Sequence, residues 1–164
     1  MPRLANGTVA PDFELAATDG KKHALKQSLG DGPVLTAFFK VSCPTCQFTF
    51  PFLERLYQQI RESGGRIWGI SQDGKEDSAR FATRYGVTFP ILIDEKPYPL
   101  SRRYGLECVP SLFLIVADQT VQVSGDGFSK ADLAEIQRRL AEDLSITPPP
   151  LFRAGEKVPE YKPG

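Results

Sequence analysis

The pattern of hydrophobic and polar positions along the chain predicts a mixed α/β fold. Residues 33–39 form an apolar run that hardly alternates, which is typical of a strand buried on both faces of a sheet. Further strands are expected at residues 66–71, 90–94, 111–116 and 121–124, and the last two should pair as a hairpin. Strands separated by helical segments in this order indicate a central mixed β-sheet flanked by crossover helices.

Helical segments fill the gaps between these strands. The longest helix is expected at residues 44–61, where leucine and isoleucine recur at helical spacing. Pro44 suits the first turn of this helix, whereas Pro51 lies inside it and should bend it. Shorter helices are expected at residues 76–85, at 99–104 and, behind the capping sequence Ser129-x-x-Asp132, at about 130–144.

The two ends of the chain differ from this middle part. Residues 10–15 and 22–25 are interpreted as two short strands joined through Asp19-Gly20, a pair that favours turns. From residue 147 the sequence becomes rich in proline and poor in core residues. We therefore expect one domain at residues 1–146, with an N-terminal β-hairpin, and a proline-rich C-terminal tail at residues 147–164. This tail should be extended along the surface or partly disordered.

Composition and charge narrow the classes of function. The chain has 164 residues, of which 41% are hydrophobic and 24% charged, as in an ordinary globular domain. Lys plus Arg and Asp plus Glu are 20 each, so no net field attracts nucleic acid or an anionic membrane. No segment has the ~18 apolar residues of a membrane helix, and the first residues lack the apolar stretch of a secretory signal. We expect a cytoplasmic monomer, unless a leader was removed and Met1 added, that binds neither nucleic acid nor membrane.

The cysteine pattern carries the candidate chemistry. Cys43-Pro44-Thr45-Cys46 lies between the strand at 33–39 and the helix that follows. A CxxC motif at the start of a helix, in a chain with too few cysteines for a disulfide framework, is typical of a redox site. The free N–H groups and the macrodipole at a helix N-terminus favour an anion, so Cys43 is the expected nucleophile. Cys46, one turn further along, is expected to resolve the mixed disulfide.

Three sequence features together resemble the thioredoxin-fold redoxins, the group that includes TlpA-like thiol oxidoreductases and alkyl hydroperoxide reductase-like proteins. They are the APDFEL segment at residues 10–15, the CxxC motif with Pro51 eight residues after Cys43, and Val109-Pro110-Ser111. The resemblance covers about residues 6 to 144. It implies a thioredoxin-like fold and thiol-disulfide exchange through the CPTC dithiol. No bound cofactor is expected, because the electrons reside in the cysteine pair.

The resemblance also assigns a second part of the site. Members of this group have a cis-proline that leaves room for a substrate backbone beside the cysteines, which implies that Val109 and Pro110 form the substrate-binding loop. Cys108 lies on the same loop and is either an accessory redox group or a small half-buried side chain. Val41 and Phe48 are candidates for an apolar collar around the site.

The sequence departs from the family where proton transfer is concerned. Ser42 stands in place of the tryptophan before the first cysteine of thioredoxin, and Ala37 in place of its buried aspartate. Thr49 occupies the position of a glutamate in TlpA-like relatives. No obvious carboxylate is therefore present to accept the proton of Cys46. The intervening Pro44-Thr45 has proline first, which favours a less reducing couple than the ~−270 mV of thioredoxin.

Two other classes of function stay open. A peroxiredoxin-like thiol-dependent peroxidase has a proline and a threonine seven and three residues before its reactive cysteine, but Thr36 and Lys40 occupy these positions. A redox sensor or a non-catalytic binding module could use the same fold, with Cys108 as the switch. A structural zinc site needs four ligands in a characteristic spacing, and three cysteines with the lone His23 do not supply it, so no metal is expected.

The sequence therefore predicts a thiol-disulfide oxidoreductase. Its partners should be a protein or small-molecule disulfide or dithiol as substrate, and a reductase or other electron donor that the sequence does not identify.

Overall fold

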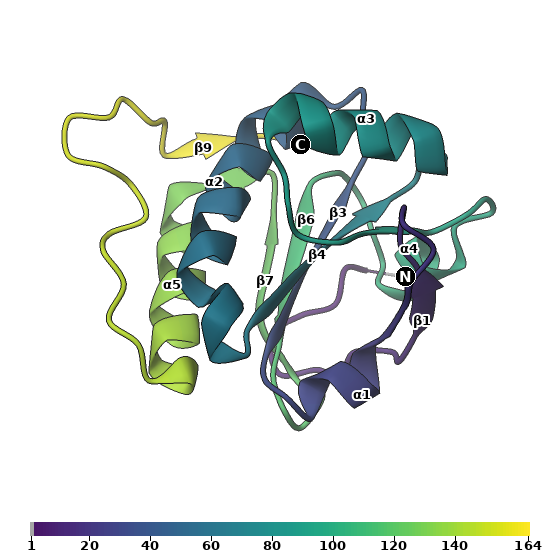
Figure 1. Ribbon diagram of the computed structural model, residues 1–164, viewed down its shortest axis with the longest axis horizontal. Coiled ribbons are helices and arrows are strands. Elements are labelled where there is room, and N and C mark those ends of the chain that lie inside the picture. The colour runs from purple at the N-terminus through teal and green to yellow at the C-terminus, as the bar shows by residue number, and fades with distance from the viewer. Residues whose placement is uncertain (1) are drawn as a thin grey trace.

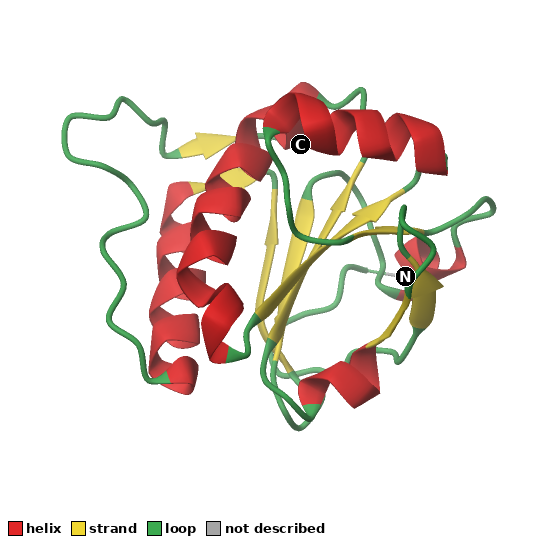
Figure 2. Cartoon of the chain, viewed as in Figure 1, coloured by secondary structure: helices red, strands yellow, loops and turns green. Residues whose placement is uncertain are grey.

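A five-stranded mixed sheet forms the centre of the molecule, in a computed structural model that describes residues 2–164 (Figures 1 and 2). The strand order is β5-β4-β3-β6-β7. β3 is parallel to β4, and β4 to β5, whereas β6 is antiparallel to both β3 and β7. The predicted α/β fold with a mixed central sheet is confirmed. The strands are β3 (Val34–Phe39), β4 (Arg66–Ser71), β5 (Ile91–Ile93), β6 (Ser111–Ile115) and β7 (Val121–Asp126).

The helices lie close to their predicted positions. Pro51 lies inside α2, as the sequence indicates. The capping sequence before α5 forms as expected, because the Ser129 hydroxyl accepts a hydrogen bond of 3.1 Å from the Asp132 N–H. The helices are α2 (Pro44–Ile60), α3 (Lys75–Tyr85), α4 (Pro99–Arg103) and α5 (Lys130–Leu144), with a short 3₁₀ turn, η1 (Arg61–Ser63), after α2. None of the helices between residues 2 and 164 is long and apolar enough to cross a membrane.

The N-terminal hairpin is shorter than predicted, and a helix follows it that the sequence pattern did not indicate. β1 (Glu14–Ala16) pairs antiparallel with β2 (Lys22–Ala24), and α1 (Leu25–Leu29) begins at the next residue. α1 has only five residues, and its N-cap position is an alanine without a capping side chain. A helix this short contains too few apolar positions to show a helical period.

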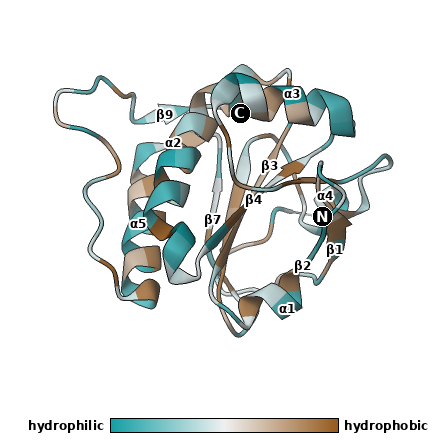
Figure 3. Ribbon diagram, in the orientation of Figure 1, coloured by the Kyte–Doolittle hydropathy of each residue, from teal (hydrophilic) through white to brown (hydrophobic). Residues whose placement is uncertain are grey.

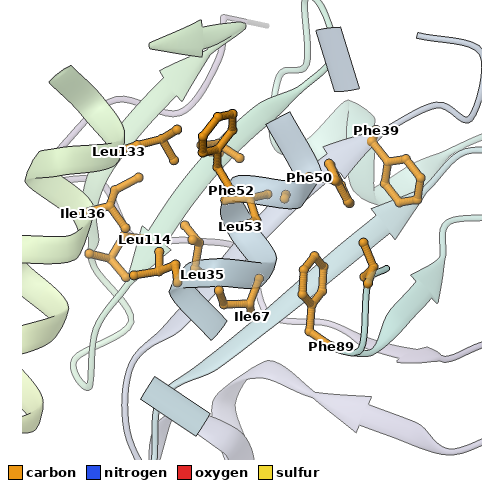
Figure 4. Close-up of a cluster of buried hydrophobic side chains, with 14 of the residues drawn as sticks. Leu35, Phe39, Phe50, Phe52, Leu53, Ile67, Phe89, Leu114, Leu133 and Ile136 are labelled. Carbon is orange, nitrogen blue, oxygen red and sulfur yellow. The ribbon is translucent and has the colours of Figure 1, made fainter. Parts of the chain in front are cut away.

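Two hydrophobic clusters cover the two faces of the sheet. The first lies beneath α2, α3 and α5; it includes Leu35, Phe50, Leu53 and Ile136, which are among the side chains labelled in Figure 4. The second lies beneath the N-terminal hairpin, α1 and α4. The colouring by hydropathy agrees with this layered core: α2 and α5 each have a hydrophilic and a hydrophobic side, and the central strands are mostly hydrophobic (Figure 3). Large aromatic side chains of the second cluster are Phe13, Phe38, Trp68, Tyr104 and Phe113.

The segment after α5 runs back along the helical face of the molecule (Figure 1). It is extended, one of the two forms predicted for residues 147–164, but it is not poor in core residues along its whole length. Leu151 is only 2% exposed and belongs to the first cluster, and the Phe152 ring lies 5.3 Å from that of Phe52. Near its end, β9 (Tyr161–Lys162) pairs antiparallel with β8 (Phe128–Ser129). Composition did not reveal these anchors, because one leucine and one phenylalanine among prolines form no periodic pattern.

Candidate active site

The loop between β3 and α2 presents the CxxC motif. The Val41 N–H donates a hydrogen bond of 2.8 Å to the Asp73 carboxylate, and the Val41 carbonyl accepts one of 2.9 Å from the Gln47 side chain. The Cys43 N–H donates to the Lys40 carbonyl at 3.2 Å. These bonds fix the turn that carries the chain from the buried strand to the helix. Cys43 is therefore held at the N-cap position of α2 by its own backbone environment.

Cys43 uses its sulfur as the capping group of α2. Its Sγ accepts a hydrogen bond of 3.1 Å from the Cys46 N–H, one of the donors that a helix N-terminus leaves without a partner. On its other side the Sγ atom lies 3.5 Å from the Val109 carbonyl oxygen, to which the thiol can donate. The side chain is half-buried, and all three cysteines are free thiols. A helix N–H that points at sulfur stabilises a negative charge there.

Cys46 has a different environment from Cys43. It is fully buried in the first turn of α2. Burial raises the pKa of the Cys46 thiol, and its hydrogen bond with Cys43 raises it further, while a hydrogen bond with the backbone of Lys40 opposes both effects. In the reduced protein Cys46 is therefore a protonated, inaccessible thiol beside a more exposed one.

The loop before β6 completes the site. The Val109–Pro110 peptide bond is cis, and the Ser111 hydroxyl donates a hydrogen bond of 2.8 Å to the Cys108 carbonyl. Cys108 is half-buried, and burial is the largest cause that raises the pKa of its thiol, followed by the negative charge of Asp126. The structure brings Cys43, Cys46 and this loop together, as the sequence predicts, although they are far apart in the chain.

Two site features were not predicted. The first is that Thr45, between the cysteines, is buried and donates a hydrogen bond of 2.7 Å to the Pro163 carbonyl. The second is that Lys162 has its Nζ atom 4.8 Å from the centre of the Phe48 ring. The tail therefore reaches the CxxC motif. No sequence signal could place it there, because the contact is made by a backbone carbonyl and by a strand of only two residues.

The positions that depart from the family pattern have structural partners of their own. Thr49 is buried, and its hydroxyl donates a hydrogen bond of 2.7 Å to the Thr45 carbonyl within α2. Ala37 is buried in β3.

The lone histidine and the metal question are settled apart from the CxxC motif. The His23 ring packs 5.6 Å from the Trp68 ring, and burial is the largest cause that lowers the pKa of His23. Within residues 2–164, no group of three or more His, Cys, Asp or Glu side chains is arranged to hold a metal ion.

This site on this sheet defines a thioredoxin-like redoxin: a dithiol at the start of a helix, facing a cis-proline loop. Comparison with protein families matches residues 6–124 to the AhpC/TSA family. The chain belongs to the AhpC/TSA family.

Curated relatives and solved structures agree with this class. The chain is 34% identical over 113 residues to the thiol-disulfide oxidoreductase ResA of Geobacillus thermodenitrificans, a match that covers 68% of this chain and 64% of that relative. The thioredoxin domain of a thiol-disulfide oxidoreductase from Bacteroides vulgatus superposes with a TM-score of 0.74 at 22% identity, covering 83% of this chain and 97% of that one. Peroxidoxin BcpB from Mycobacterium tuberculosis gives a TM-score of 0.73 at 24% identity, covering 85% and 98%. These two structures support the fold.

Proposed function

We propose that this chain is a thiol-disulfide oxidoreductase in which Cys43 is the nucleophile and Cys46 the resolving thiol. The observation that carries the proposal is the position of the Cys43 sulfur, which accepts the Cys46 N–H at the start of α2 and faces the carbonyl of Val109. The relatives named ResA are described as thiol-disulfide oxidoreductases, which supports the same reaction.

In the first step the Cys43 thiolate attacks one sulfur of a substrate disulfide. A new S–S bond forms between Cys43 and that sulfur, the substrate S–S bond breaks, and the other substrate sulfur leaves as a thiolate. Cys43 suits this role because its side chain is only half-buried and the N–H at the helix start favours the anion. Cys46 does not compete for the substrate, since it is fully buried.

In the second step Cys46 attacks the Cys43 sulfur and releases the second substrate sulfur as a thiolate. The mixed disulfide prepares this step, because Cys43 then has neither a thiol proton nor a charge. The hydrogen bond and the charge of Cys43, which both raise the pKa of Cys46 in the reduced protein, are thereby removed. The substrate thiolate released in the first step can take up the Cys46 proton. Overall, two electrons pass from the Cys43–Cys46 pair to the substrate, and the pair becomes a disulfide.

A redox titration tests this proposal. The protein is equilibrated in dithiothreitol and glutathione buffers, free thiols are alkylated, and each cysteine is counted by mass spectrometry. We expect a reversible two-electron disulfide between Cys43 and Cys46, with the same midpoint in a Cys108→Ser control. If no such disulfide forms at any buffer ratio, the oxidoreductase proposal is wrong. A peroxide-consumption assay on the same samples separates exchange from the peroxidase alternative, which requires peroxide to oxidise Cys43 rapidly.

The partners follow as part of the same proposal. We propose a disulfide or dithiol substrate, an electron donor that regenerates the reduced pair, and a monomeric protein in the cytoplasm. The chain has only three cysteines, too few for a disulfide framework, which supports a reducing compartment. Cell fractionation, with thiol trapping of Cys43 and Cys46 before lysis, tests the compartment and the resting redox state together.

A further inference from the structure

The tail, residues 147–164, is fastened at several points between α5 and the CxxC motif. Leu151 is buried in the first cluster, and the Arg55 guanidinium binds both carboxylate oxygens of Glu156 at 2.8 and 2.6 Å. Such a bidentate pair fixes direction as well as distance. In Figure 1 the tail leaves the far end of α5, loops away from the body and returns to the end of the molecule where α2 begins.

The last part of the tail, residues 160–164, lies against the site itself. Here it is called the strap. The Lys130 N–H donates a hydrogen bond of 2.9 Å to the Glu160 carbonyl, which anchors the strap next to the β8–β9 pair. The Thr45 hydroxyl donates to the Pro163 carbonyl at 2.7 Å. The strap therefore runs from the start of α5 to Thr45, one of the two residues between Cys43 and Cys46.

The strap then reaches the loop that contacts the Cys43 sulfur. A β-carbon added to Gly164 would collide with the Val109 carbonyl oxygen and lie 3.0 Å from the Cys108 Sγ. That carbonyl oxygen is the atom 3.5 Å from the Cys43 Sγ. Gly164 and the Cys43 sulfur thus both lie against the Val109 carbonyl group.

A polypeptide disulfide must bring its backbone into this region. In a disulfide the two Cα atoms lie only about 4.4–6.8 Å apart, so a substrate chain bonded to Cys43 runs close beside it. On the Val109 side of Cys43, residues 163–164 of the strap lie against the two neighbours of this space, Thr45 and the Val109 carbonyl. A small disulfide has no backbone to accommodate and needs only a path for its sulfur, which the half-buried Cys43 beside exposed Ser42 and Pro44 provides.

We propose that the strap is an intramolecular pseudosubstrate: it occupies the place of an extended polypeptide beside Cys43, and polypeptide disulfides must displace it before they react. The contacts that hold the strap then describe the partner surface as well. A displacing chain would make the same three contacts. One of its backbone carbonyls accepts a hydrogen bond from the Thr45 hydroxyl, and its backbone pairs with the edge of β8. A basic side chain of the displacing chain lies over the Phe48 ring. The inference deepens the proposed function and rests on it for its biological meaning.

The test compares two reagents that attack the same thiol. One is 2,2′-dithiodipyridine, and the other is an eight-residue peptide whose single cysteine carries the 2-thiopyridyl group. The rate of thiopyridone release is measured for the reduced full-length protein and corrected with a Cys43→Ser variant. The reaction needs only a reactive Cys43 thiol. It therefore reads out the strap even if the Cys43–Cys46 pair cannot cycle, so the failure of this inference and that of the proposed function are distinguishable.

Two variants loosen the strap and one serves as a matched control. Lys162→Ala removes the cation above the Phe48 ring, and the triple variant Tyr161→Gly, Lys162→Gly, Pro163→Gly raises the entropic cost of docking. Lys157→Ala makes the same change as the first variant at an exposed tail position. The peptide rate, relative to the small-reagent rate, should rise about two- to fivefold in Lys162→Ala and about tenfold or more in the triple variant. It should stay unchanged in Lys157→Ala.

Three results would overturn the inference. The peptide-to-small ratio stays constant in both loosened variants; or both reagents accelerate by the same factor, which indicates general exposure of Cys43; or Lys157→Ala raises the ratio as much as Lys162→Ala. An unprotected Lys130 amide in the unaltered protein, measured by hydrogen exchange, would overturn it as well, because the acceptor of this amide is the Glu160 carbonyl and the strap would then not be docked.

Discussion

The two faces of the central sheet are filled with similar aromatic side chains, yet the candidate active site lies at the end of the face beneath α2, α3 and α5. The face under α2, α3 and α5 is covered by helices of 11 to 17 residues, and the start of α2 points an N–H at the Cys43 sulfur. The other face is covered by a short hairpin and by α1 and α4, which have five residues each. A long helix that starts at the end of the sheet provides both a covering surface and an anion site, whereas short pieces provide only cover. Changes on the second face should therefore alter stability and leave the chemistry intact.

The largest expected effect in this comparison is the loss of exchange when Cys43, the proposed nucleophile, is removed. Cys43→Ala should lower the rate of disulfide exchange by about 10³-fold or more, as expected when a covalent nucleophile is lost. The free energy of unfolding should change little, since the side chain is only half-buried. Exchange kinetics with a small disulfide, together with denaturant unfolding, give both quantities. Residual exchange near the unaltered rate would show that Cys108 or Cys46 is the nucleophile instead.

At Trp68 we expect a loss of stability without a loss of exchange. Trp68 belongs to the second cluster, and its ring lies 5.9 Å from the Phe13 ring. Trp68→Ala should cost about 3–5 kcal/mol of unfolding free energy, while the exchange rate per folded molecule stays the same. Urea unfolding followed by circular dichroism measures the first quantity. The control is Val9→Ala, an exposed site (66%) at which about 0.5 kcal/mol or less is expected. A loss of exchange in fully folded Trp68→Ala molecules would break the division between the two faces.

The length of each element explains which parts of the fold were predictable from the sequence. α2 and α5 bury one side over several turns, so their apolar spacing is visible in the sequence. α1 is too short to show a period, and β8 and β9 have two residues each, so their pairing depends on tertiary contact. A strand of two residues has no alternation to detect.

The candidate site divides in a similar way. Cys43 and Cys46 were predictable because the chemistry depends on residue type and spacing within one motif, and the Val109-Pro110 loop because its sequence resembles that of a family. The contact between Thr45 and Pro163 was not predictable, because a hydroxyl that donates to a backbone carbonyl leaves no mark on the sequence of the tail. The burial of Leu151 was not predictable either, because a single leucine among prolines forms no pattern that indicates a core position.

A smaller loss of stability tests whether the tail, through Leu151, is part of the first cluster. Leu151→Ala should cost about 2–3 kcal/mol, the lower part of the range for buried leucines, because an extended tail can move to fill part of the cavity. Thermal and denaturant unfolding measure it. Lys157→Ala, at an exposed position of the same tail, should stay within about 0.5 kcal/mol of the unaltered protein. Equal effects at the two positions would mean that the tail contributes nothing to the core.

The weakest and most local effect concerns pH. Hydrogen bonds from Arg55 are the largest cause that lowers the pKa of Glu156 from 4.5 to about 2. A released tail therefore binds a proton at Glu156 at higher pH than a docked tail does. The ion pair stabilises docking fully above pH ~4.5, and this contribution is lost as the pH falls toward about 2. An NMR titration of the Glu156 carboxyl and of the amides at residues 156–162 should show the tail loosening in that range, and Glu156→Gln should abolish the dependence. If Glu156 titrates at its ordinary pKa while the amides stay protected, the Arg55 contact does not fasten the tail, and its hold on the site rests on Leu151, β9 and Thr45 alone.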